Sequence, residues 1–310
     1  MGETHNTRRR EAAVLANIIC VLFWGFSFIS IKVTVLVFQP MTLGAARFAI
    51  AVVVLFFIQL FSSKSHDQQR SLKPAKKDIP LLVASGLLGV TFYFFGENHG
   101  VALVTASEAS IIVAAIPVLT ITAEWVAEKL TGKLKRDRLG LRNWMGAFVS
   151  MAGVALVAGV SFSISGSIAG YLYMGGAALC WVAYGFLTRP LFTRKRTRTY
   201  IVFWQNFFGF LGFLPFAAME RANWGTPSLP VIFHLIFLAV FCSAFGYWLY
   251  AHSMEVLGVL ASTVFINLIP VVTVIAGFFI MKDRLTALQW GGAVLVLTGV
   301  YLTVLPKRPV

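Results

Sequence analysis

Charged residues are scarce in this chain of 310 residues: Asp, Glu, Lys and Arg make up 12 % of it, and apolar residues make up 58 %. A soluble domain carries about 25 % charged residues, because water must solvate its surface. The composition therefore excludes most soluble enzymes and predicts a surface that faces lipid. Long uncharged runs agree, for example Leu81 to Gly96 and Val231 to Met254, since a membrane-spanning helix needs roughly 20 such residues.

Cysteine and the motifs of nucleotide or metal chemistry are also scarce or missing. The three cysteines, Cys20, Cys180 and Cys242, lie inside apolar runs without the spacing of a metal site or a disulfide framework. No G-x-x-x-x-G-K-S/T, H-E-x-x-H or G-x-S-x-G motif occurs, which excludes an ATP-driven pump with its motor in the same chain. The longest polar stretch, Ser62 to Asp78, leaves no room for a folded soluble domain. We expect neither a cofactor nor a metal site.

Apolar windows predict ten membrane-spanning helices, so the expected fold class is an all-α polytopic membrane protein. Arg8 to Arg10 stand before the first window like the start of a signal peptide, but no small-residue cleavage site follows, and we interpret this window as helix 1. The predicted spans are 12–31, 41–61, 79–98, 104–127, 143–161, 167–188, 200–219, 229–251, 260–281 and 287–305.

The net charge of +14 is informative about topology rather than about nucleic acid. With a cytoplasmic amino terminus, 21 of the Lys and Arg residues fall in cytoplasmic stretches and only four outside, with Arg47 inside helix 2. This asymmetry predicts that both termini are cytoplasmic and that the stretches 62–78, 129–142 and 189–199 face the same side. We expect the lipid bilayer, not nucleic acid, as the partner.

The two halves of the chain resemble each other. Pro117 aligns with Pro270, and each is followed by an acidic–basic–Leu-Thr sequence and then by a Trp-x-Gly-Ala helix, which begins at Trp144 or Trp290. The repeat unit has five helices, an odd number, so the second copy must be inverted. We predict two repeats, 1–161 and 162–310. Inverted repeats are typical of transporters, with the substrate site between them near the midplane; the alternative is a duplication that only builds a larger bundle.

These residues resemble the drug/metabolite transporter superfamily, in particular proteins with two EamA-type repeats. The matching pieces are Trp24-Gly25, Pro40 with Ala46-Arg47-Phe48, the helix 4 proline with its trailing residues, and the second-half counterparts. The resemblance covers about residues 12–305. It implies a ten-helix secondary carrier of the inner membrane, often an exporter of amino acids or other metabolites, with a cavity lined by helices 1, 3, 4, 6, 8 and 9.

Ionisable groups and prolines inside the spans are the candidates for gating or coupling. Arg47, Glu97 and Glu108 are expected in the outer third of the membrane, where one positive charge could meet two carboxylates. The alternatives are snorkelling of Arg47 to the headgroups and an interfacial place for the carboxylates. Pro117 and Pro270 each remove a backbone donor and kink their helix, as a gate joint or as a static packing feature.

Aromatic and neutral polar residues in the spans are the candidates for substrate binding. Trp24 and Trp181 occupy equivalent places in the two repeats, and Phe245 and Trp248 share a face of helix 8. An aromatic cavity suits an apolar, aromatic or cationic molecule, although ordinary helix packing explains the same pattern. The predicted substrate-binding residues are Trp24, Ser27, Phe28, Ser110, Trp181, Tyr184, Phe245, Trp248 and Asn267.

The sequence thus predicts a secondary transporter, not an enzyme, that moves a small organic solute by alternating access, with export as the direction that the resemblance implies. A proton-coupled multidrug exporter is one alternative. A membrane-embedded lipid-processing enzyme or a receptor is another, but the five histidines are scattered over both sides of the membrane instead of converging at one depth. We expect a monomer or a weak dimer.

Overall fold

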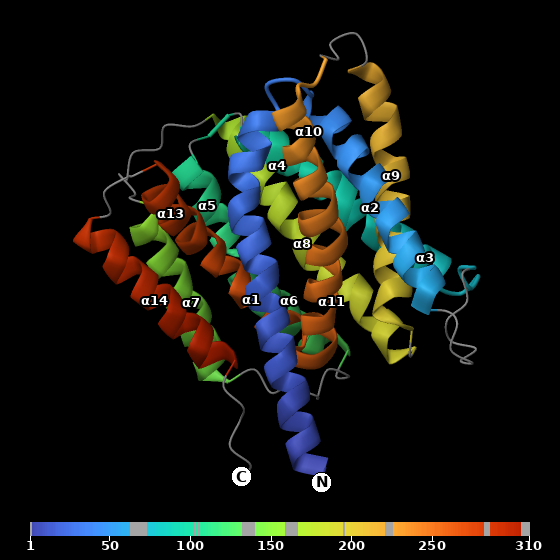
Figure 1. Cartoon of the computed structure of the whole chain (residues 1–310). Helices are drawn as coiled ribbons and strands as arrows, with labels where there is room; N and C mark the ends of the chain where they lie inside the picture. Colours follow the sequence, from blue (N-terminus) through green and yellow to red (C-terminus); the bar gives the residue numbers. More distant parts are fainter. Residues whose placement is uncertain are drawn as a thin grey trace.

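The molecule is a bundle of membrane-length helices (Figure 1). The computed structural model describes residues 2–62, 73–101, 103–104, 106–131, 140–158, 167–194, 196–220, 226–281 and 286–304. In these ranges nine helices are long and apolar enough to cross a membrane, and Leu141–Val157 is a shorter apolar helix. The predicted all-α membrane fold with ten spans is confirmed.

Some spans are single helices and others consist of shorter helices in line. The first five spans are α1 (Gly2–Thr34), α2 (Pro40–Ser62), α3–η2–α4 (Ile79–Gly86, Leu87–Phe92, Tyr93–Val101), α5–α6 (Ala106–Ala114, Ile116–Thr131) and α7 (Leu141–Val157). The second five are α8 (Ile168–Thr193), α9 (Arg198–Met219), α10–η4–α11 (Leu229–Phe237, Leu238–Phe245, Gly246–Leu257), α12–η5–α13 (Val259–Val264, Phe265–Asn267, Leu268–Met281) and α14 (Ala287–Val304).

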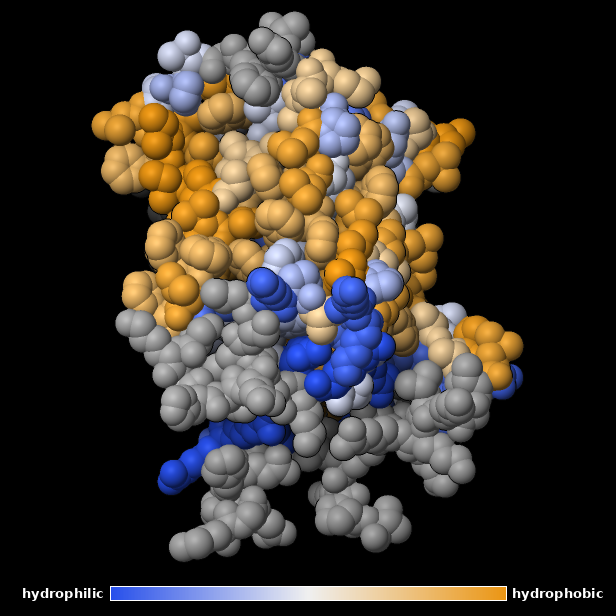
Figure 2. Space-filling view, turned by 90° about the vertical axis from the view of Figure 1, so that its right-hand side faces the viewer, coloured by the Kyte–Doolittle hydropathy of each residue, from blue (hydrophilic) through white to orange (hydrophobic). Residues whose placement is uncertain are grey.

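The first and last helices meet at one end of the bundle, here named the termini end. Figure 1 shows α1 beginning and α14 ending there, at the bottom of the view. Arg10 joins them, because its guanidinium donates a hydrogen bond to the carbonyl oxygen of Val304 at 3.4 Å. Figure 2 shows apolar residues over most of the visible side of the bundle and hydrophilic ones gathered toward this end. The surface therefore has the apolar band that a bilayer requires.

Two spans contain a π-helical segment that the apolar pattern did not predict. Helix 3 has η2 at Leu87–Phe92, and helix 8 has η4 at Leu238–Phe245. The last residues of these segments, Phe92 and Phe245, are as far apart in sequence as Pro117 and Pro270. The distortion thus occupies the same place in both repeats. Such π segments insert a wider turn into a helix and are frequent at functional sites.

The aligned prolines follow interruptions in helices 4 and 9. Ala115 separates α5 from α6 just before Pro117, and the 3₁₀ segment η5 ends three residues before Pro270. Proline has no N–H to donate to the carbonyl four residues earlier, and its ring crowds that carbonyl. The predicted break in helical regularity is therefore present at both prolines.

The two Trp-x-Gly-Ala helices, α7 and α14, pack against each other through glycine. A Cβ at Gly146 would lie 2.7 Å from the carbonyl oxygen of Gly299, and one at Gly153 would lie 2.7 Å from that of Gly292. Gly146 and Gly292 are equivalent in the repeats, as are Gly153 and Gly299, so equivalent residues exchange places across the contact. This pattern requires antiparallel helices, as an inverted pair of repeats supplies, and close backbone approach of this kind is a common means of helix association in membranes.

The other contacts between the halves follow the same symmetry. α1 packs on α11, and its counterpart α8 packs on α4; α2 packs on its own counterpart α9. Helices 1 and 6 therefore each lie against a π-containing span of the opposite half. This arrangement brings the aromatic residues of both halves together at the centre of the bundle.

Candidate functional site

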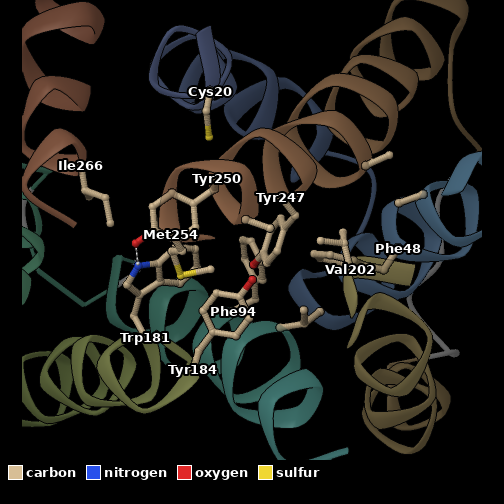
Figure 3. Close-up of a cluster of buried hydrophobic side chains, with 14 of the residues drawn as sticks. Cys20, Phe48, Phe94, Trp181, Tyr184, Val202, Tyr247, Tyr250, Met254 and Ile266 are labelled. Atoms are coloured by element: carbon tan, nitrogen blue, oxygen red, sulfur yellow. Dashed lines mark hydrogen bonds between the residues drawn. The ribbon is translucent and has the colours of Figure 1, made fainter. Parts of the chain in front are cut away.

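Aromatic side chains from both halves form a buried cluster at the centre of the bundle, here named the ring cluster. Its members are Trp24 of α1, Trp181 and Tyr184 of α8, and Tyr247 and Tyr250 of α11. The ring centroid of Trp24 lies 5.5 Å from that of Trp181 and 5.4 Å from that of Tyr250. All but Trp24 are almost completely buried. Figure 3 shows Trp181, Tyr184, Tyr247 and Tyr250 converging from their helices.

The ring cluster binds the backbone of both π segments. The hydroxyl of Tyr247 donates to the carbonyl oxygen of Gly89 in η2 at 2.8 Å, and the indole nitrogen of Trp24 donates to that of Cys242 in η4 at 3.0 Å. Gly89 and Cys242 occupy equivalent positions in the two repeats. Trp181, the counterpart of Trp24, instead donates to the hydroxyl of Tyr250 at 3.3 Å. The two carbonyls thus have the same kind of partner, but the donors come from different helices.

Arg47 lies inside the bundle, not at the headgroups. Its side chain reaches from α2 to η4, where Nε donates to the hydroxyl oxygen of Ser243 at 2.8 Å. The residue is 4 % exposed. The central guanidinium carbon is 4.7 Å from the ring centroid of Phe94 and 5.3 Å from that of Phe48. These cation–π contacts stabilise the charge where water is absent, so the alternative of snorkelling does not describe the structure.

Glu97 of α4 is near Arg47 but is not paired with it. One of its carboxylate oxygens accepts a hydrogen bond from the hydroxyl of Tyr93 at 2.9 Å. The ion pairs within 4.0 Å among the described residues do not include Glu97 or Arg47. Phe94, three residues before Glu97 on α4, has its ring centroid 4.7 Å from the guanidinium carbon of Arg47, which brings this helix close to Arg47. Tyr93 lies on the path from Glu97 to the ring cluster, because its ring centroid is 4.8 Å from that of Trp181.

Other predicted site residues have different surroundings. Ser27 donates back to the carbonyl oxygen of Trp24 at 2.7 Å, and Asn267 donates to Ser150 of α7 at 2.8 Å. Both side chains therefore form hydrogen bonds within the helix bundle in this structure. The side chains of Phe28, Glu108 and Ser110 lie outside the described part of the structure.

Phe245 and Trp248, which were expected on one face of helix 8, have different surroundings. Phe245 is 38 % exposed and contacts Phe241, which is also exposed. Trp248 instead donates to Thr199 at 3.1 Å and carries the guanidinium of Arg198 over its ring at 4.8 Å. Phe245 is the last residue of η4, and Trp248 lies three residues later in α11, where it faces α9.

Ion pairs at the termini end were missed by sequence reasoning. Asp78, whose side chain is fully buried, pairs with Arg194 at 2.9 Å and with Arg196 at 2.6 Å. Glu255 pairs with Arg9 at 3.1 Å and with Arg198 at 3.4 Å. The one available signal was that Asp78 is an acidic residue directly after Lys76 and Lys77 in a basic segment; Glu255 has no basic segment near it in the sequence.

These pairs connect different helices at the termini end. Asp78 precedes α3 and binds the α8–α9 connection, and Glu255 of α11 binds α1 and α9. Arg189 of α8 adds a pair with Glu124 of α6 at 3.7 Å. The five ion pairs between described residues all lie at this end and hold its helices together. The described residues contain no group of three or more His, Cys, Asp or Glu side chains that could hold a metal ion.

The comparison with known families agrees with this geometry. A model of the EamA-like transporter family matches residues 11–159 and 168–305. The chain belongs to the EamA-like transporter family. The chain is also similar to a protein of known crystal structure, with a TM-score of 0.73 and 19 % sequence identity over 94 % of this chain and 96 % of the other. At this identity the similarity concerns the fold alone.

Relatives of the EamA-like chain are named as transporters. It is 26 % identical over 284 residues to an uncharacterized transporter of Archaeoglobus fulgidus, covering 92 % of this chain and 95 % of the relative. It is 23 % identical to a probable terminal-alkyne amino-acid exporter of Streptantibioticus cattleyicolor, covering 94 % and 92 %. It is 25 % identical to a probable amino-acid metabolite efflux pump of Escherichia coli, covering 96 % of each. The family and these names indicate a transporter, not an enzyme.

Proposed function

We propose that this EamA-like chain is a secondary transporter that exports a small organic solute, an amino acid or a related metabolite, across a bacterial-type plasma membrane by alternating access. The names of the two exporters among its relatives support this substrate class. Both termini are on the cytoplasmic side in this proposal, because the basic residues gather in the stretches on that side.

The observation that carries the proposal is the ring cluster. It draws Trp24 from one repeat and Trp181 from the other, and it contacts both π segments. In transporters with inverted repeats the substrate site lies between the repeats near the midplane, at discontinuous helices. The contact of aromatic residues from both repeats with both distorted spans supports a substrate site at the ring cluster.

The ion pairs define the conformational state in this proposal. Glu255, Asp78 and Glu124 fasten the termini end through partners on other helices or connections. The structure therefore corresponds to a state closed toward the cytoplasm, and export requires these contacts to separate while the solute enters from that side.

Reconstitution into liposomes tests the proposal directly. Purified protein is inserted into vesicles, and the uptake of radiolabelled amino acids, amines and nucleosides is measured with and without a pH gradient. We expect saturable transport of at least one amino acid, absent from protein-free vesicles. Transport of unrelated cationic drugs alone, coupled to protons, supports the multidrug alternative and contradicts the proposed substrate class.

A further inference from the structure

Arg47 and Glu97 are two opposite charges that share one region of the bundle without meeting. Arg47 uses Nε for its hydrogen bond to Ser243, and its two terminal nitrogens donate no hydrogen bond to any residue that the structure describes. Glu97 accepts the hydrogen bond from Tyr93 with one carboxylate oxygen, and within the described ranges its other oxygen accepts none. An unpaired charge at membrane depth is strongly unfavourable. The two terminal nitrogens of Arg47 and one carboxylate oxygen of Glu97 are therefore available to a ligand.

The surroundings of Arg47 limit how a ligand can reach it. The rings of Phe94 and Phe48 lie near the guanidinium, and Ser243 occupies its Nε. What remains is the edge with the two terminal nitrogens. This edge presents parallel N–H donors that match the two oxygens of a carboxylate. A carboxylate is thus the chemical group that the free edge of Arg47 fits best.

The free oxygen of Glu97 has the complementary preference. It is an acceptor with a negative charge, next to the ring of Tyr93, and therefore suits an ammonium group. A lone anion at Arg47 would leave Glu97 beside a like charge, and a lone cation at Glu97 would do the same to Arg47. A zwitterion neutralises both, since it carries its two charges on neighbouring carbons.

We propose that Arg47 and Glu97 recognise the two ends of a zwitterionic α-amino acid, Arg47 its carboxylate and Glu97 its ammonium group, with the amino-acid side chain directed toward the ring cluster. The direction follows from Tyr93, which contacts Glu97 through its hydroxyl and Trp181 through its ring. This inference rests on the proposed function and assigns residues to its substrate. Ser243 and Tyr93 are positioning residues, because they orient the two charged groups.

The test compares each amino acid with relatives that lack one charge. Proteoliposomes are assayed with L-phenylalanine, phenethylamine and 3-phenylpropionate, and with L-leucine, isoamylamine and 4-methylvalerate. We expect at least one amino acid to be transported at least tenfold faster than its amine and its acid. An amine transported as fast as its amino acid overturns the assignment of Arg47 while leaving the proposed function intact. Failure of every solute, the amino acids included, contradicts both.

Variants of the two residues must change selectivity in opposite directions. Arg47→Gln should lower the transport rate of the amino acid at least tenfold and lower that of the amine less. Glu97→Gln should lower the rate of the amino acid and leave that of the acid unchanged. Arg47→Lys retains the charge but not the paired donors, so its amino-acid transport rate should lie between those of the parental protein and Arg47→Gln. Glu128→Gln at the end of α6 is the matched control and should keep the parental selectivity. If both site variants slow all solutes equally, the residues are structural and the proposal is wrong.

A binding measurement covers the case in which Arg47→Gln assembles poorly. The thermal unfolding temperature of the purified parental protein is measured with each of the six compounds, and again for Glu97→Gln. The amino acid that is transported should raise the unfolding temperature of the parental protein more than its amine or acid does. Glu97→Gln should lose this difference. An equal rise with amino acid and acid in the parental protein contradicts the role of Glu97.

Discussion

The indole nitrogen of Trp24 donates a hydrogen bond to the carbonyl oxygen of Cys242, 3.0 Å away and 218 residues later in the chain. This bond connects α1 with the π segment η4 and therefore the first repeat with the second. The π turn displaces the regular hydrogen-bond pattern of its helix, and an unpaired carbonyl in the bilayer interior costs free energy. Trp24 thus has two roles: its indole nitrogen binds the distorted backbone, and its ring packs in the ring cluster.

Trp24→Phe should separate these two roles, because it retains an aromatic ring and removes the donor. We expect a loss of about 0.5–1.5 kcal/mol in the free energy of unfolding, the range for one hydrogen bond, measured by denaturation in detergent. Trp204→Phe is the matched control, since the buried indole nitrogen of Trp204 has no hydrogen-bond partner in the described structure. An equal loss in both variants would mean that ring size, not the hydrogen bond, determines the effect.

The carboxylates at the termini end should differ in what their removal costs. The side chain of Asp78 is fully buried between two arginines, whereas that of Glu255 is 29 % exposed. An exposed pair contributes about 0.2–1 kcal/mol. The loss of Asp78 should exceed this range but stay below the roughly 3–5 kcal/mol of a fully buried pair, because Arg194 and Arg196 are 36 % and 17 % exposed. Asp78→Asn should therefore lower the free energy of unfolding far more than Glu255→Gln. Similar losses, measured side by side in detergent, would contradict this account of burial.

Topology can be tested with single cysteines at positions that the structure shows to be exposed. In a background without Cys20, Cys180 and Cys242, cysteine is placed at Lys76 near the termini end or at Leu36 near the opposite end. In sealed cells an impermeant thiol reagent should label the residue at position 36 and not that at position 76. Labelling at 76 in sealed cells would contradict a cytoplasmic termini end.

The spans could be predicted because the thickness of a bilayer fixes their length and the apolar runs show it directly. Trp24 and Trp181 could be paired because they occupy equivalent places in two similar halves. The inward position of Arg47 could not be predicted, since the sequence does not show that Phe48, Phe94 and Ser243 surround its guanidinium.

Local irregularity was the main obstacle to predicting the site. A π segment is an apolar run like its neighbours, so η4 is invisible in the hydropathy pattern. The hydropathy pattern also did not show that Phe245 is exposed whereas Trp248 contacts Thr199 of α9. The ion pairs of Glu255 were equally hidden, because Arg9 and Arg198 come from helices distant in sequence.

The prolines offer the most direct test of movement. Pro117 follows the break between α5 and α6, and Pro270 follows η5. An alanine at either place supplies the missing N–H, which favours a continuous helix. If these spans bend during alternating access, Pro117→Ala and Pro270→Ala should lower the transport rate several-fold while protein yield in the membrane stays near the parental value. The measurement is initial transport per molecule in proteoliposomes, with yield determined by quantitative blotting. Parental rates in both variants would show that the breaks only serve packing, and that whatever bends during transport lies elsewhere, with the π segments as the next candidates.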